Sequence, residues 1–265
     1  MTVAGAKNSG RDGRCGRPHY RDPVIAAAAF CPGTPLLVPV PGAATPDPAL
    51  AAVRAASALA VGTLAGLDRI VVIGPAATSL LHSPVAEGSL AAYGLDVEVH
   101  LGSLACGATD PLPLSLTVGA WLLRDAFGPS TGAVGVSCGP DFGAGPAAAG
   151  LLGLADGDAR VGLLVVADGA ERFPPLDGPG HTAADIATSD ARSDALDDRL
   201  AAALAAGDGD ALADLPDPQA LVHLGSLPAW RAAGSLLAGP GVTARLLARE
   251  SSHGVGWLVA AWTLT

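Results

Sequence analysis

The stretches RIVVIG at residues 69–74 and RVGLLVVA at residues 160–167 decide the fold class. Each is short, rich in β-branched residues and apolar at nearly every position. Strands that are apolar on both faces are typical of a parallel sheet covered by helices on each side. The two stretches therefore predict buried strands of an α/β protein.

Working outward, strand-like and helix-like segments alternate along the chain. Further strands are expected at residues 24–30, 95–101, 133–137, 242–247 and 255–264, and helices at residues 47–65, 112–127, 146–155, 189–206 and 219–237. This alternation predicts one α/β domain over residues 23–265, with a mostly parallel central sheet flanked by helices and a functional site at the carboxyl ends of the strands. Residues 1–22 are polar, rich in Gly and Arg and without periodicity, so a disordered tail is expected there.

Charge and cysteine content narrow the choice of partners and compartment. The formal net charge is −10, which opposes binding to nucleic acid or to an anionic membrane surface. The apolar run at residues 24–30 is far shorter than the roughly 20 residues that span a bilayer. Four widely spaced cysteines form no CxxC pair, which favours a reducing compartment. We therefore expect a cytoplasmic protein with neither a nucleic-acid nor a membrane partner.

Several common catalytic motifs are missing from the sequence. It contains no GxxxxGK[ST] phosphate loop, no GxGxxG after a first strand and no HExxH pair. Ser137-Cys138-Gly139 follows a predicted strand and could place a nucleophilic thiol, but a buried, inert cysteine is the alternative.

Four polar residues near predicted strand ends are candidates for chemistry. His82 follows the strand at residues 69–74 in a predicted loop, and a solvated loop histidine is the alternative. Glu250 and His253 precede the last strand, where a carboxylate and an imidazole would suit iron, manganese or zinc, or would simply form a polar turn. Asp168 directly follows the strand at residues 160–167. It could serve there as a ligand or base, or it could form a turn with Gly169.

Several segments, in their order along the chain, resemble a known family. They are FCPGTPLLVP at residues 30–39, DRIVVIGP at 68–75, ADGAE at 167–171, the helix start at 189–198 and HGVGW at 253–257. This order is similar to that of the catalytic B subunit of class III extradiol ring-cleavage dioxygenases, the LigB-like superfamily. The resemblance covers about residues 24–265. It implies a single LigB-like domain, a small aromatic ligand, and Fe(II) or another divalent metal held by two histidines and a carboxylate.

At the positions that the resemblance assigns to these functions, this chain has other residues. Gly33 stands at the first metal histidine, and Pro75 begins the segment that would hold the second, with His82 several residues later. Ala170 or Glu171 stands at the acid/base histidine. The expected pocket is lined by Gly33, Pro75, His82, Asp168 and Glu250. The candidate catalytic residues are His82, Asp168 and Glu171.

Three functions remain open from the sequence. The first is a metal-dependent oxidoreductase whose site is rearranged onto His82, Glu250 and His253. The second is a dioxygenase-like protein with a degenerate or absent metal site, which binds a small molecule without catalysis. The third is an interaction protein, for instance a homodimer formed through the closing strands or helices.

Overall fold

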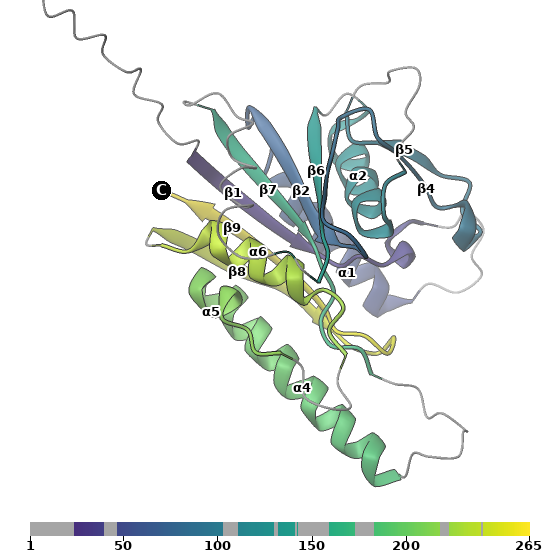
Figure 1. Ribbon diagram of the computed structural model, residues 1–265, viewed down its shortest axis with the longest axis vertical. Helices are drawn as coiled ribbons and strands as arrows, with labels where there is room; N and C mark the ends of the chain where they lie inside the picture. The colour runs from purple at the N-terminus through teal and green to yellow at the C-terminus, as the bar shows by residue number, and fades with distance from the viewer. Residues whose placement is uncertain are drawn as a thin grey trace, which may run out of the picture.

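The computed structural model describes residues 24–39, 47–102, 111–129, 132–140, 142, 159–172, 183–217, 223–239 and 241–265. The expected tail at residues 1–22 and the expected helix at residues 146–155 lie outside these ranges. Within them, the chain builds one central sheet with helices on both faces (Figure 1). No helix in the described ranges is both long enough and apolar enough to cross a membrane.

Seven strands form the central sheet in the order β3-β6-β2-β7-β1-β9-β8. The strands are β1 (Val24–Cys31), β2 (Arg69–Pro75), β3 (Leu80–His82), β6 (Ala133–Cys138), β7 (Arg160–Val166), β8 (Val242–Glu250) and β9 (Trp257–Leu264). The four central strands β6, β2, β7 and β1 run parallel to one another, whereas β3, β9 and β8 are antiparallel to their neighbours. The prediction of an α/β fold with a mostly parallel central sheet is confirmed.

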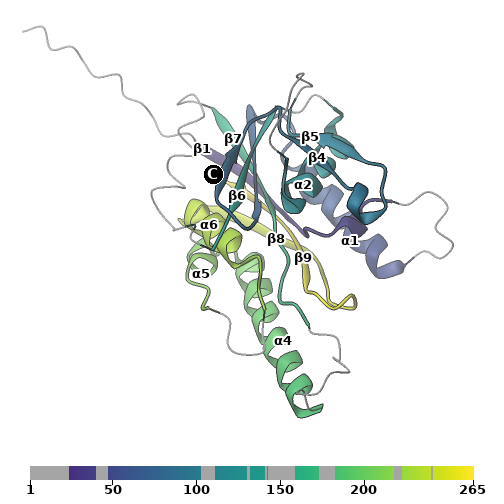
Figure 2. The ribbon, with the colours of Figure 1, turned by 45° about the vertical axis from the view of Figure 1, so that its right-hand side comes forward.

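Helices cover the sheet in two groups. They are α1 (Pro48–Gly62), α2 (Leu114–Phe127), α4 (Ala183–Ala206), α5 (Gly209–Ala213) and α6 (Leu227–Leu237). Val71 and Ile73 of β2 belong to the apolar layer shared with α4, α5 and α6, while Ile70 and Val72 belong to the layer shared with α1 and α2. Figure 2 shows the two groups of helices on opposite sides of the sheet. Because both faces of β2 are buried, its sequence has no polar position in the middle.

Most expected elements are present with shifted bounds. The helix expected at residues 189–206 begins at Ala183, and the one expected at residues 219–237 is helical over Leu227–Leu237 within the described ranges. The strand expected at residues 95–101 shortens to β5 (Glu98–His100), which pairs with β4 (Glu87–Ser89) in a separate two-stranded sheet. β3 and β4 were not predicted, because elements of 3 residues show no periodicity.

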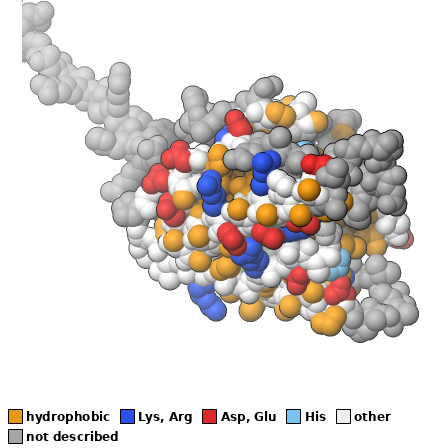
Figure 3. Space-filling view, turned by 90° about the horizontal axis from the view of Figure 1, so that it is seen from below, with side chains coloured by type: hydrophobic (Ala, Val, Ile, Leu, Met, Phe, Trp, Pro, Cys, Tyr) orange, Lys and Arg blue, Asp and Glu red, His pale blue; other side chains and the backbone are white. Residues whose placement is uncertain are grey.

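The expected closing pair of strands is confirmed, because β8 and β9 pair antiparallel and β8 forms one edge of the sheet. Arg249 of β8 forms a 2.6 Å ion pair with Asp198 of α4. Seen from below, acidic and basic side chains are interspersed with hydrophobic ones over this side of the molecule (Figure 3). A homodimer through this pair of strands stays a prediction.

Candidate functional site

A cleft of about 610 Å³ lies where β1, β2 and β7 end. The segments after these strands line it with Gly33, Thr34, Pro35, Pro75, Ala76, Asp168, Gly169, Glu171 and Arg172, joined by Leu114, Gly225, Ser226, Gly254 and Val255. Parallel strands bring their carboxyl ends to one edge, so residues distant in sequence meet there. Of the residues expected to line a pocket, Gly33, Pro75 and Asp168 lie along this cleft, whereas His82 and Glu250 are not among its lining residues. That the cleft is a functional site stays a prediction.

Hydrogen bonds to both its backbone and its side chain hold Asp168 in this cleft. Its backbone N–H donates to Ser226 Oγ over 2.9 Å, and its carbonyl oxygen accepts from Trp230 Nε1 over 2.9 Å. Its side-chain Oδ1 accepts from the Gly33 backbone N–H at 3.0 Å. Since Ser226 and Trp230 are themselves buried, these three hydrogen bonds fix the position of a half-buried carboxyl group.

Gly33 has no side chain, and this leaves room for the Asp168 carboxyl group. A Cβ atom at this position would lie 3.2 Å from Asp168 Oδ2, which is closer than a carbon and a carboxylate oxygen normally approach. A bulky residue such as histidine could therefore fit at position 33 only if the Asp168 carboxyl group moved. Gly33 and Asp168 form a matched pair, with glycine supplying an N–H donor and room for the carboxyl group.

The surroundings of Asp168 make its protonation state responsive near neutral pH. Burial raises its pKa from 3.8 to about 6, and the nearby charge of Glu171 adds to the increase, while the hydrogen bond from Gly33 opposes it. A carboxyl group with a pKa of about 6 is mostly ionised at pH 7, yet it accepts a proton more readily than an ordinary aspartate.

Glu171 and His223 form an ion-pairing contact beside Asp168. Glu171 Oε1 lies 2.8 Å from His223 Nδ1, and the Glu171 backbone N–H donates to the His223 carbonyl oxygen at 2.9 Å. The two side chains are 48% and 59% exposed, so the contact is open to water. Glu171, a candidate catalytic residue from the sequence, thus lines the cleft, while His223 was not identified from the sequence.

A partly buried network behind the cleft holds the segment that carries Glu171. Arg172 Nη2 contacts Asp194 at 2.6 Å and Asp197 at 3.0 Å. Asp197 Oδ1 also accepts from the Ala170 backbone N–H at 2.8 Å. The Asp197 side chain is only 2% exposed, and burial raises its pKa.

Two glycines make room for the Asp197 carboxylate. A Cβ atom on either Gly169 or Gly256 would overlap its oxygen atoms. The two glycines come from the segment after β7 and from the turn before β9, so the network joins these segments to α4. Sequence reasoning missed this network, although the Asp-Gly after β7 and the glycine-rich turn were visible signals.

The structure does not bring together the proposed metal ligands His82, Glu250 and His253. His82 was expected in a loop but is the last residue of β3, is 2% exposed and lies opposite Gly135 in the middle of β6. Its Nε2 is 3.1 Å from Ser137 Oγ. The prediction of a loop position was wrong because the antiparallel return of β3 along β6 buries the side chain within the sheet.

Glu250 and His253 share the turn between β8 and β9, where other groups engage them. His253 Nε2 lies 2.7 Å from Asp47 Oδ2, and its ring stacks on Trp257 at a centroid distance of 4.6 Å. Glu250 Oε1 accepts from the backbone N–H groups of Ser251 and Ser252, both at 2.8 Å, and these bonds lower its pKa. This turn is the polar alternative that the sequence left open.

The donor set at the cleft does not fit the Fe(II) centre implied by the resemblance. Gly33 and Pro75 offer no side-chain ligand, and Glu171 stands near the position of the expected acid/base histidine. Among the described residues, no group of three His, Cys, Asp or Glu side chains is placed to hold a metal ion. A two-histidine, one-carboxylate centre needs three such ligands converging on one point.

Two other features are structural in character. Burial raises the pKa of the Cys138 thiol to about 12, so this cysteine is protonated and poorly nucleophilic.

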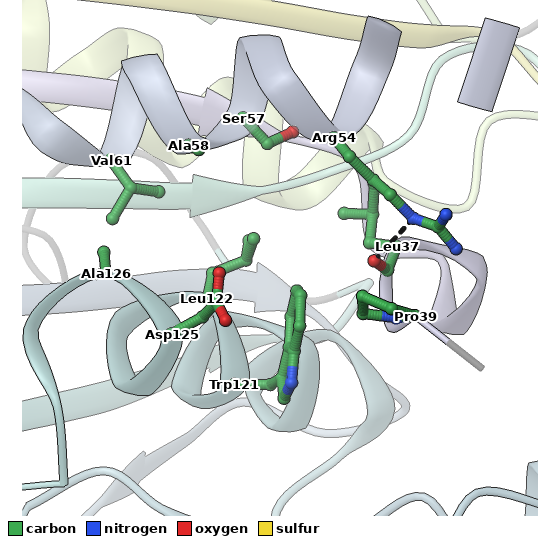
Figure 4. Close-up of a pocket in the computed structure, with 10 residues that line it drawn as sticks. All are labelled: Leu37, Pro39, Arg54, Ser57, Ala58, Val61, Trp121, Leu122, Asp125 and Ala126. Atoms are coloured by element: carbon green, nitrogen blue, oxygen red, sulfur yellow. Dashed lines mark hydrogen bonds between the residues drawn. The ribbon is translucent and has the colours of Figure 1, made fainter. Parts of the chain in front are cut away.

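A smaller cavity, of about 90 Å³, lies between α1 and α2, with Trp121, Leu122 and Val61 among its lining residues (Figure 4). Arg54 Nε donates to the Leu37 carbonyl oxygen at 2.9 Å at one end of it. Its size and largely apolar lining are those of a packing gap.

No family model matches the chain, and a search of curated proteins finds no match. The resemblance to the LigB-like superfamily therefore depends on the sequence segments alone.

Proposed function

We propose that this chain is a LigB-like α/β protein that binds a small organic molecule in the cleft at the carboxyl ends of β1, β2 and β7, with Asp168 as the polar anchor. Three observations support a binding role: the volume of the cleft, the mixture of apolar and polar lining, and the firm placement of one carboxyl group. Binding sites for small molecules commonly have a volume of about 300–1,000 Å³ and a few fixed polar groups.

The observation that carries this proposal is the Asp168 carboxyl group, held through Oδ1 and raised in pKa to about 6 by burial. A half-buried carboxylate lowers its free energy when a ligand donates a hydrogen bond to it. Asp168 would therefore orient a hydroxyl or amino group, and it could also accept a proton from such a group. No step through iron is proposed, because the cleft lacks the ligand set that iron requires.

A fragment-binding experiment tests the proposal. Small aromatic alcohols, phenols and amines are titrated into the full chain, and backbone amide shifts of Gly33, Gly225 and Ser226 are followed by NMR. We expect saturable shifts at these amides that weaken at least about tenfold in Asp168→Asn. The control Asp96→Asn changes an exposed carboxylate outside the cleft lining and should bind as the unaltered chain does.

Two results would contradict the proposal. One is shift changes that map away from the cleft, or that are unaltered in Asp168→Asn. The other is near-stoichiometric iron in protein purified anaerobically with added Fe(II), since it would show that other ligands complete a metal centre. We expect far less than one iron per chain.

We also propose that the protein works in the reducing cytoplasm. Cys31 and Cys138 are both buried as free thiols, and burial raises the pKa of each to about 12. Such thiols are consistent with a compartment in which disulfides do not form.

A further inference from the structure

The cleft combines two kinds of side chain that together indicate a class of ligand. Pro35, Pro75 and Leu114 give it an apolar lining, while Asp168 and Glu171 add carboxyl groups. A ligand that satisfies both must have an apolar body and a polar group near Asp168.

Among the described residues that line the cleft, the charges that face a ligand are negative. Asp194 and Asp197 of α4 both accept from the Arg172 guanidinium, so the cation in the lining is already neutralised by carboxylates that do not line the cleft. Asp168 and Glu171 remain as the charges that face a ligand. Glu171 also contacts His223, which is positive only when protonated.

We propose that the ligand is a small organic cation, with an ammonium group at Asp168 Oδ2 and a short apolar body against Pro75 and Leu114. This inference rests on the proposed binding function of the same cleft. Oδ1 already accepts from Gly33, whereas the described residues supply no hydrogen bond to Oδ2. An ammonium group donates to such an oxygen and also offsets the charge of Glu171.

An anion is the main competing ligand class. Arg172 Nη1 is buried without an acceptor in the described residues, and a carboxylate ligand could in principle contact it. However, the atom has almost no accessible surface, and an anion in the cleft would lie close to Asp168 and Glu171. Repulsion between like charges in a partly desolvated site is larger than in water, which favours the cation.

Three probes of similar shape and different charge test the proposal: benzylamine, benzyl alcohol and benzoate, each titrated into the full chain and followed by the same amide shifts. At pH 7.5 we expect benzylamine to bind at least about tenfold more tightly than benzyl alcohol, with benzoate weakest, because charge-assisted hydrogen bonds are about twice as strong as neutral ones. At pH 5.0, where Asp168 is largely protonated, benzylamine should lose most of this advantage.

Variants assign the effect to individual carboxylates. Asp168→Asn should abolish the preference for benzylamine over benzyl alcohol, and Glu171→Gln should reduce it by roughly twofold to threefold because Glu171 is half exposed and screened by water. Asp96→Asn should leave all three affinities unchanged.

The outcomes separate the two proposals. If benzyl alcohol or benzoate binds in the cleft as tightly as benzylamine, the ligand is not a cation, while binding at Asp168 stands. If the preference for benzylamine persists in Asp168→Asn, the assignment to this carboxylate is wrong. If no probe and no member of the wider fragment set shifts the cleft amides, both the ligand class and the binding function are refuted.

Discussion

Replacing Asp168 with asparagine should stabilise the folded protein at neutral pH. Burial raises the pKa of Asp168 from 3.8 to about 6, so the folded state disfavours the ionised carboxylate more than the unfolded state does. Each pKa unit corresponds to about 1.4 kcal/mol, which gives a destabilisation of about 3 kcal/mol by the ionised group at pH 7.5. Asparagine carries no charge and can still accept from the Gly33 N–H through its amide oxygen.

The sign of the pH dependence follows from proton linkage. Below the unfolded pKa, Asp168 is protonated in both states and its ionisation costs no stability. As the pH rises from about 4 to about 6, the unfolded state ionises first, and stability due to this group falls to a constant lower level. The gain from Asp168→Asn should therefore be about 1 kcal/mol at pH 4.5 and about 3 kcal/mol at pH 7.5.

Urea unfolding at several pH values, followed by tryptophan fluorescence, measures this difference. Asp96→Asn serves as the matched control, because an exposed carboxylate should change the free energy of unfolding by less than about 0.5 kcal/mol at every pH. The reasoning fails if Asp168→Asn changes stability equally at pH 4.5 and 7.5, or if it destabilises the protein at pH 7.5. A variant that is more stable but binds benzylamine poorly would show that the cleft sacrifices stability for function.

Three further changes test the supports of the cleft by the same unfolding assay. Asp197→Ala leaves the largely buried Arg172 guanidinium without one of its carboxylate partners and should lower the free energy of unfolding by about 3 kcal/mol. An unchanged free energy of unfolding would show that the network does not stabilise the fold. Gly256→Ala should lower the free energy of unfolding by about 2 kcal/mol or more, because the new methyl group overlaps the Asp197 carboxylate. The double variant with Asp197→Ala should lose less stability than the sum of the two single losses, and strict additivity would disprove the overlap. Trp230→Phe removes the indole N–H that donates to the Asp168 carbonyl oxygen and should cost about 1–3 kcal/mol, whereas an unchanged midpoint would mean that water replaces this bond.

The parallel strands at the centre of the sheet could be predicted from the sequence because their burial is visible in their residue pattern. β2 and β7 are apolar at nearly every position, and this pattern is the direct consequence of burial between two layers of helices. Their carboxyl ends then had to meet at one edge, so Pro75 and Asp168 could be assigned to a common cleft before any coordinates were known.

The position of His82 could not be predicted in the same way. β3 has 3 residues and reverses direction to pair with β6, and its exposed Leu80 and Leu81 precede a buried histidine. Nothing in so short a segment has a period, and pairing with a distant strand decides which side chain is buried. The same holds for Arg172 and Asp197, whose partnership joins a strand end to a helix that follows a long connection.

The relation between Gly33 and Asp168 gives the physical reason why the implied metal site does not fit this chain. A side chain at position 33 and the Asp168 carboxyl group would compete for the same space, since a Cβ there comes within 3.2 Å of Oδ2. An imidazole at position 33 would need part of the space that the Asp168 carboxyl group now occupies, so that carboxyl group would have to shift to admit it. Gly33 and Asp168 instead form a different polar site, in which the backbone N–H of the glycine donates to the carboxyl group.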